Sequence, residues 1–293
     1  MDYVVLENAD LRVEILKKGA EIRSVLSKLT DTEYIWQADK NYWGRHAPLL
    51  FPIVGKLKDD QFEYNDAIYH MSQHGFARDM TFDVEGNDND SVKLSLKDTS
   101  ETQKVFPFKF LLVVEYQLIA NRLTTSYSVT NLDNDETMYF SIGAHPGFKV
   151  PLESQTRFED YYIEVSPEKT RNFIPVTEEV LLQTKNIVQT DQSKFELTRE
   201  LFKDGVIILE TAGSTRVTLK SDKSERKIAI DYTDMPYLGL WTTYPDEGEF
   251  VCIEPWCGIA DAYDSNGKFS EKKGINSLNP ETSFTTHYQI TFS

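Results

Sequence analysis

Alternation of apolar and polar residues, repeated from one end of the chain to the other, is the sequence feature that most restricts its fold. Side chains of a β-strand point alternately to opposite faces, so a period of two predicts strands with one face buried. The longest runs cover residues 108–118 and 123–129, and the break at Asn121-Arg122 predicts a long antiparallel hairpin. Further runs occur at residues 11–15, 92–96, 217–219, 228–232 and 288–292. We therefore expect an all-β protein.

Half-buried strands of this kind are covered when two sheets stack. This favours a large antiparallel β-sandwich over the alternative, a barrel. Helix signals are few and short, at residues 178–182 and at residues 198–202, where Thr198 could cap the start. No linker rich in Pro, Gly or Ser interrupts the pattern, and 293 residues suffice to bury a large core. Residues 1–293 are accordingly expected to form one domain.

An excess of acidic residues limits the partners that the chain can have. The net charge is −16, from 47 acidic and 31 basic residues, which argues against nucleic acid as a partner. The first residues lack a signal sequence, and no apolar run approaches the roughly 20 residues of a membrane helix. We expect a soluble, cytoplasmic protein without membrane contact. Cys252 and Cys257 are the only cysteines, and both are expected as free thiols in a reducing compartment.

His145 lies in a stretch, Tyr139 to Val150, that fixes its backbone. Pro146 follows it, and Gly143 and Gly147 permit turns or the close approach of other atoms. Imidazole titrates near neutrality, so a ring held in this way is suited to general acid catalysis. A hydrogen-bonded histidine of the core is the alternative interpretation.

Glu254 interrupts an otherwise apolar strand at residues 250–256. In a strand it shares one face with Cys252 and Trp256, so a carboxylate lies beside an indole. Burial raises the pKa of a carboxyl group and a nearby cation lowers it, and a balance of the two would make Glu254 a general base near neutral pH. The alternative is a buried carboxylate that pairs with an arginine. Pro255 favours a strand end or a bulge at this point.

A second histidine, His74, stands before Gly75 and close to Arg78. Glycine lets the backbone turn there, and arginine can meet an anion or sugar hydroxyls. His70 and His74 have the spacing of metal ligands on a helix, but the glutamate and the helical pattern of a zinc protease are missing. We therefore expect no metal site.

Aromatic and basic side chains supply further candidates for binding a polar ligand. Indole faces suit the apolar face of a sugar ring, although plain core packing is the alternative for each of them. Guanidinium and ammonium groups can bind hydroxyl or phosphate groups, or can lie free on the surface. The residues concerned are Trp43, Trp241 and Trp256, and Arg45, Lys56 and Arg78.

Four motifs, taken together and in this order, resemble the galactose mutarotase (aldose 1-epimerase) family, most of all its LacX-like branch. They are Gly44-Arg45, HGFAR from His74 to Arg78, GAHPGF from Gly143 to Phe148 and CIEPWCG from Cys252 to Gly258. The similarity extends over nearly the whole chain. It implies a β-supersandwich with a broad open groove, a free aldose as the substrate and no cofactor.

The resemblance also implies roles for individual residues. His145 matches the general acid at the ring oxygen, Glu254 matches the base at the anomeric hydroxyl, and His74 matches a histidine that helps to hold the ring oxygen. Arg45 matches an arginine that binds hydroxyls. An aspartate that positions hydroxyls in the family matches Asp204, in a segment that aligns loosely, and the alternative is that Lys203 holds its place.

The sequence therefore predicts an aldose 1-epimerase that interconverts the α and β anomers of a free aldohexose. Galactose-specific members of the family have His-Gly-Gly where this chain has HGFAR, and hexose-6-phosphate mutarotases share HGFAR. A hexose-6-phosphate mutarotase is thus one alternative, and a non-catalytic sugar-binding protein of the same fold is another. A glycosidase is disfavoured because such enzymes normally use two carboxylates.

Overall fold

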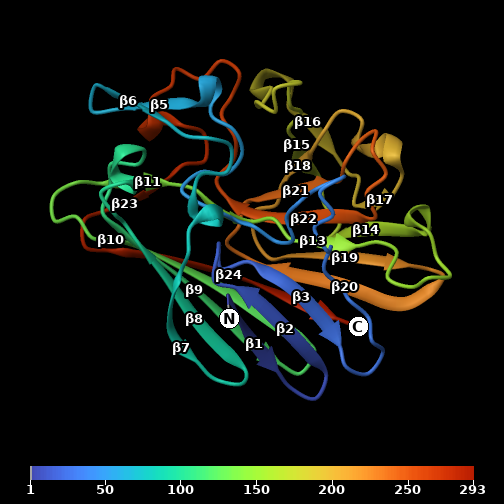
Figure 1. The fold of residues 1–293 in the computed structure, drawn as a ribbon. Helices are drawn as coiled ribbons and strands as arrows, with labels where there is room; N and C mark the ends of the chain where they lie inside the picture. Colours follow the sequence, from blue (N-terminus) through green and yellow to red (C-terminus); the bar gives the residue numbers. More distant parts are fainter. Residues whose placement is uncertain (1) are drawn as a thin grey trace.

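Two large antiparallel sheets form the body of the protein in the computed structural model, which describes residues 2–293 (Figure 1). One sheet has nine strands in the order β17-β14-β19-β20-β24-β10-β9-β8-β7. The other has eight, in the order β16-β15-β18-β21-β22-β12-β4, with β13 also paired to β22. Among the described residues there is no α-helix. The predicted all-β sandwich is confirmed.

Most strands of the eight-stranded sheet are shorter than those of the nine-stranded sheet. The nine-stranded sheet consists of β7 (Asp83–Asn87), β8 (Ser91–Lys97), β9 (Phe110–Ile119), β10 (Arg122–Asn131), β14 (Tyr161–Ser166), β17 (Lys194–Glu196), β19 (Thr215–Ser221), β20 (Ser224–Tyr232) and β24 (Ser283–Phe292). The eight-stranded sheet consists of β4 (Leu49–Leu50), β12 (Ile142–Ala144), β13 (Gly147–Lys149), β15 (Arg171–Phe173), β16 (Val188–Thr190), β18 (Ile207–Glu210), β21 (Tyr237–Trp241) and β22 (Phe250–Cys257).

Smaller elements complete the fold. Three small sheets contain β1 (Tyr3–Glu7), β2 (Leu11–Leu16) and β3 (Ile22–Ser27), then β5 (Gln61–Tyr64) and β6 (Ala67–His70), then β11 (Met138–Phe140) and β23 (Asn276–Leu278). Short 3-10 turns are η1 (Lys58–Asp60), η2 (Ala77–Asp79), η3 (Thr102–Lys104), η4 (Phe158–Asp160), η5 (Thr184–Asn186), η6 (Arg199–Phe202) and η7 (Phe269–Glu271). In residues 2–293 no helix is long and apolar enough to cross a membrane.

The predicted long hairpin is β9 and β10. Leu118 pairs with Leu123 beside the turn, and the register continues without a shift to Phe110 opposite Asn131. Every second residue of both strands is buried, as the alternation predicts. The C-terminal strand β24 pairs with β10 on one side and β20 on the other, so the end of the chain lies inside the sheet (Figure 1).

One of the two predicted helices is wrong, and the other is a single 3-10 turn. Residues 178–182 form a turn because Val180 has φ of 64°, a left-handed value at which a right-handed helix cannot continue. The second segment is η6, and the hydroxyl of Thr198 accepts a hydrogen bond from the backbone N–H of Leu201 at its start. That capping role is confirmed.

The central strand β22 is buried along its whole length and pairs with β21 on one side. On its other side the partner is interrupted. β12 pairs with residues 256 and 257 and β13 with residues 250–252, while His145 and Pro146 form the turn between them. Of the two predictions for Pro255, a strand end is wrong, because β22 continues to Cys257, and the irregularity lies in the partner strand. Proline is tolerated there because its missing N–H lies opposite the gap between β12 and β13.

Apolar side chains fill the space between the two sheets. Phe51 contacts the rings of Phe110 and Phe140, which come from different sheets, at centroid separations of 5.1 and 6.0 Å. All three side chains are buried. Both cysteines are buried free thiols, as predicted. Each Å² of apolar surface removed from water stabilises the folded state by about 25 cal/mol. The closely packed core also forms a rigid base for the residues of the eight-stranded sheet.

Replacing Ile290 of β24 by alanine is expected to lower the free energy of unfolding by about 2–5 kcal/mol, because the side chain is fully buried and leaves a cavity. Chemical denaturation measures this. The matched control is Ile119→Ala at the end of β9, where the side chain is 59% exposed, and the change should stay within about 0.5 kcal/mol. Equal effects of the two substitutions would contradict the packing described here.

Candidate active site

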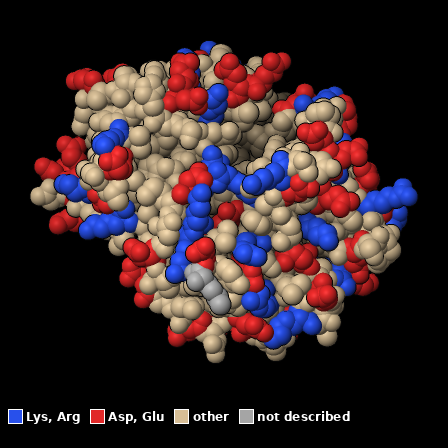
Figure 2. All heavy atoms as spheres, viewed as in Figure 1, with Lys and Arg blue, Asp and Glu red and all other residues tan. Residues whose placement is uncertain are grey.

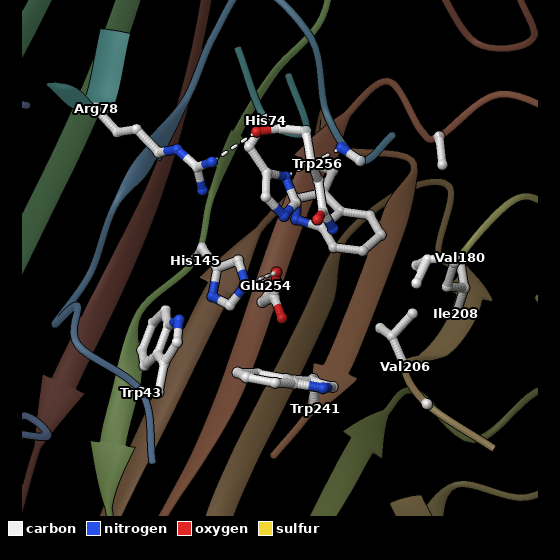
Figure 3. A pocket seen from close by; sticks show the side chains of 14 residues that line it. Trp43, His74, Arg78, His145, Val180, Val206, Ile208, Trp241, Glu254 and Trp256 are labelled. Atoms are coloured by element: carbon white, nitrogen blue, oxygen red, sulfur yellow. Dashed lines mark hydrogen bonds and ion pairs between the residues drawn. The ribbon is translucent and has the colours of Figure 1, made fainter. Parts of the chain in front are cut away.

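A cavity of about 340 Å³ opens over β18, β21 and β22 in the eight-stranded sheet (Figure 3). Seven of the candidates named from the sequence line it, namely Trp43, His74, Arg78, His145, Trp241, Glu254 and Trp256. They come from segments far apart in the chain. The lining also includes residues that the sequence gave no reason to select as ligand-binding, among them Gln73, Val180, Val206 and Ile208.

The interrupted edge of β22 brings His145 against Glu254. The turn between β12 and β13 is held by the backbone, since His145 donates its N–H to the carbonyl of Pro48 and Ile253 donates to the carbonyl of Pro146. His145 Nε2 lies 3.2 Å from Glu254 Oε2. Glu254 is 1% exposed and His145 8%. The partner of the buried carboxyl group is thus a histidine, not an arginine.

Burial favours the uncharged form of both groups. It raises the pKa of the Glu254 carboxyl group well above its ordinary value and lowers the pKa of His145 to about 3. Both shifts favour uncharged groups, because charge is poorly solvated in a buried site. These shifts favour a neutral pair in which the shared proton is on the Glu254 side. The pair can act as donor and acceptor together, which is the requirement for coupled acid and base chemistry.

His74 is held close to this pair by an unusual backbone. His74 and Gly75 have φ of 69° and 70°, both left-handed. Gly75 cannot be replaced without movement, because an added Cβ would lie 2.3 Å from the carbonyl oxygen of Phe51. The Nδ1 atom of His74 accepts a hydrogen bond from the N–H of Gly55, and its ring centroid lies 5.5 Å from that of His145. Burial lowers the pKa of His74 well below its ordinary value.

Glycines make room for the indole of Trp256 beside Glu254. Gly239 pairs with Glu254 and Gly143 pairs with Trp256 across the neighbouring strands. A Cβ on Gly239 would lie 2.4 Å from the Trp256 ring, and one on Gly143 would lie 2.6 Å from it. Close approach, which the sequence suggested for Gly143, is thus what this glycine provides, and neither glycine has a left-handed φ.

Two further indoles enclose the catalytic candidates from the other side. Trp43 stacks on the ring of His145 with centroids 4.9 Å apart, and Trp241 meets the same ring edge-on at 5.8 Å. Figure 3 shows Trp256 and Trp241 on either side of Glu254. The cavity therefore offers flat apolar walls around a polar centre. Such walls suit the C–H faces of a sugar ring.

Basic residues lie at one rim of the cavity. Arg78 donates a hydrogen bond to the carbonyl of Gln73 at 2.6 Å, and burial followed by the nearby charge of Arg45 lowers its pKa to about 10. Arg45 is not among the lining residues and binds both carboxylate oxygens of Asp79 at 3.2 Å. Figure 2 shows basic side chains beside the hollow on this face.

Asp204 occupies a different position from the one the resemblance suggested. Its side chain is exposed and is not among the residues that line the cavity, whereas the next two residues, Gly205 and Val206, are. Residues 206–209 are a continuous apolar run, which is typical of a buried strand, and β18 begins at Ile207. Sequence alone could not show that this strand lies beside β21 and faces the same cavity as Glu254.

Three buried residues bring potential metal ligands together. Donor atoms of His145, Cys252 and Glu254 all lie within 4.8 Å of one another. Metals bind the thiolate form of cysteine, and burial raises the pKa of the Cys252 thiol well above its ordinary value. His145 and Glu254 are in contact with each other. The arrangement fits a proton-sharing pair better than a metal centre.

Comparison with known proteins agrees with this geometry. The family model described as aldose 1-epimerase matches residues 2–291. This chain belongs to the aldose 1-epimerase family. The chromosomal protein LacX of Lactococcus lactis subsp. lactis is 32% identical over 296 residues, which cover 98% of each chain.

Solved structures of family relatives have the same fold. A galactose mutarotase related enzyme from Lactobacillus acidophilus is 42% identical, with a TM-score of 0.96 over 99% of this chain and 97% of that one. A galactose mutarotase-like protein from Lactobacillus casei ATCC 334 is 31% identical, with a TM-score of 0.91 over 99% and 100% of the two chains. The fold of this family member is thus a galactose mutarotase-like supersandwich.

Gly239→Ala is expected to displace Trp256 and to lower the free energy of unfolding by about 1–3 kcal/mol, because the added methyl group overlaps the indole. Near-ultraviolet circular dichroism and chemical denaturation measure the two effects. Gly86→Ala is the control, because a Cβ there meets nothing within 4 Å. An unchanged tryptophan spectrum in Gly239→Ala would show that the indole does not lie on this glycine.

Proposed function

We propose that this protein is an aldose 1-epimerase that interconverts the α and β anomers of a free aldohexose. The observation that carries the proposal is the buried contact between His145 and Glu254, 3.2 Å apart at the centre of a cavity with indole walls. Opening a cyclic hemiacetal requires one group that removes the proton of the anomeric hydroxyl and one that protonates the ring oxygen. A single acid and base suffice for this, and the reaction consumes no co-reactant.

The proposed reaction starts with the proton on His145 and a carboxylate on Glu254. Hydroxyl groups of the bound sugar supply hydrogen bonds that stabilise these charged forms, in place of the water lost on burial. Glu254 takes the proton of the anomeric hydroxyl, and the O–H electron pair forms the carbonyl at C1. The C1–O5 bond breaks, its electron pair stays on O5, and His145 Nε2 gives O5 a proton.

The products of ring opening are an aldehyde, a neutral His145 and a protonated Glu254. This is the protonation state that burial favours in the ligand-free site. Rotation about the C1–C2 bond presents the other face of the carbonyl. Ring closure returns the proton of O5 to His145 and that of Glu254 to the anomeric oxygen, which yields the other anomer and restores the starting state.

His74 and the indoles have supporting roles in this proposal. His74 lies at the His145 end, where it can contact the ring oxygen or its neighbours. The stack of Trp43 on His145 fixes the plane of the imidazole. Orientation of this kind matters because proton transfer depends on hydrogen-bond geometry.

A phosphorylated aldohexose is a second candidate substrate, and the basic rim favours it. C6 is attached to the carbon next to O5, so a 6-phosphate would lie on the His145 and His74 side. Arg78 lines that side, and Arg45 lies close enough to act on the pKa values of both histidines. Asp79 binds Arg45, so its single negative charge offsets one of the two guanidinium groups.

Glu254→Gln and His145→Asn are each expected to lower kcat by about 10²- to 10⁴-fold, because each removes a group that moves a proton. Polarimetry of freshly dissolved α-glucose and α-galactose measures this. The matched controls are Glu196→Gln and His287→Asn, two exposed residues of the nine-stranded sheet. Full activity in either site variant would contradict the assignment, and sugar binding without accelerated anomerisation would identify a non-catalytic sugar-binding protein.

Glucose and glucose 6-phosphate distinguish the two candidate substrates. If the phosphate binds at the basic rim, Arg78→Met should raise KM for glucose 6-phosphate by about tenfold or more and change KM for glucose far less, because a charge-assisted contact is lost. Lys223→Met, at an exposed surface lysine, is the control. An equal effect of Arg78→Met on both sugars would exclude a phosphate-binding role for Arg78.

A further inference from the structure

The cavity has one polar end and one apolar end. His145, His74 and Arg78 lie at the first, and Val180, Val206 and Ile208 lie together at the second (Figure 3). The side chains of the apolar end contain no hydrogen-bonding group. Because the residues of the two ends come from opposite sides of β22, the polarity of the cavity changes across the sheet.

Strand register gives the order of these groups. Ile208 pairs with Gly239, and Gly239 pairs with Glu254, so these three lie in one line across β18, β21 and β22. Neighbouring strands are about 4.8 Å apart, which puts Ile208 roughly 10 Å from Glu254 along the sheet. His145 lies on the other side of β22, beyond the edge that pairs with β12 and β13. The order is therefore His145, Glu254, Ile208.

This order and the proposed function together define the orientation of the bound sugar. The inference therefore rests on the proposed function. The ring oxygen lies at His145 and the anomeric oxygen at Glu254. C2 follows C1 in the ring on the side away from the ring oxygen. A sugar bound in this way directs its C2 substituent from Glu254 toward the apolar end.

Val180 is held at the apolar end by a strained backbone. Its φ of 64° is a conformation that a β-branched residue rarely adopts. The surrounding hydrogen bonds enforce it, since Thr177 donates its N–H to the carbonyl of Leu181 and Leu182 donates to the carbonyl of Asp261. The hydroxyl of Thr177 also accepts from the N–H of Leu181. A strained residue that lines a cavity indicates that its side chain is needed there.

The side chains of Val180, Val206 and Ile208 offer a C2 hydroxyl group no hydrogen-bonding partner. Asp204, the carboxylate nearest in sequence to Val206, is exposed and outside the lining. Burying a hydroxyl group without a hydrogen bond is unfavourable. We propose that the site selects aldoses whose C2 substituent presents apolar atoms to this end, namely the C–H of a 2-deoxyhexose or the methyl group of a 2-acetamido-2-deoxyhexose, and that Val180 determines this specificity.

Equilibrium binding tests the inference independently of turnover. Isothermal titration calorimetry gives dissociation constants for glucose, 2-deoxyglucose and N-acetylglucosamine. At least one of the two modified sugars should bind about 10- to 100-fold more tightly than glucose, the range by which apolar pockets discriminate. Tighter binding of 2-deoxyglucose alone would assign the effect to loss of the hydroxyl group, and tighter binding of N-acetylglucosamine would assign it to contact with the methyl group. Glucose binding as tightly as both would overturn the proposal.

Val180→Asn tests the residue itself. Asparagine tolerates a left-handed φ better than valine, so the variant should fold, and its amide gives a C2 hydroxyl group a partner. The preference for the modified sugars over glucose, measured as the ratio of dissociation constants, should fall about tenfold. Val188→Asn, at a valine on β16 that is 55% exposed and away from the cavity, should keep the preference. An unchanged preference in Val180→Asn would exclude this role.

The same sugars separate this inference from the proposed function. Anomerisation rates measured by polarimetry or NMR exchange report on catalysis, and calorimetry reports on recognition. A preference for the modified sugars without accelerated anomerisation would reject the epimerase and keep the apolar end as a recognition element. Accelerated anomerisation with a preference for glucose would keep the epimerase and reject the inference.

Discussion

The incomplete pairing of one edge of β22 is the constraint on which the site depends. β12 and β13 pair with the two ends of this strand, and the turn between them places His145 opposite Glu254. Glu254 therefore has no paired strand residue on this edge, and the turn residue His145 takes that position. The gap also accommodates Pro255, whose missing N–H would weaken a complete ladder. One break in a sheet thus supplies both the space and the partner for a buried carboxyl group.

Burial affects which protonation states of Glu254 and His145 are favoured. Burial disfavours the charged forms of Glu254 and His145, so one proton and two groups form a neutral pair. The same neutral pair is the product of hemiacetal opening in the proposed reaction. The ligand-free site therefore already has the protonation state that accompanies the open-chain sugar. Binding of the cyclic sugar has to supply the hydrogen bonds that move the proton back to His145.

Around the pair, small residues and strained backbone set the shape of the cavity. Gly143 and Gly239 admit the indole of Trp256, and left-handed φ values aim His74 and Val180 into the cavity from two different loops. Membership of the aldose 1-epimerase family accounts for the type of reaction proposed. This chain combines a basic rim with an apolar end. In the proposals made above, these two features determine which aldose binds.

The sequence alone determined the strands and the shared face of Glu254 and Trp256, and it singled out His74 and His145 as candidates, because alternation and glycine-proline motifs depend on residues close together in the chain. It led to a wrong helix at residues 178–182, and of the strand end or bulge predicted at Pro255 the strand end is wrong, because tertiary contacts override local preference. Only the tertiary structure decided that His145 touches Glu254, that Asp204 is exposed, and that Val180, Val206 and Ile208 share one cavity. These facts depend on the register between strands separated by many residues, which no local pattern encodes.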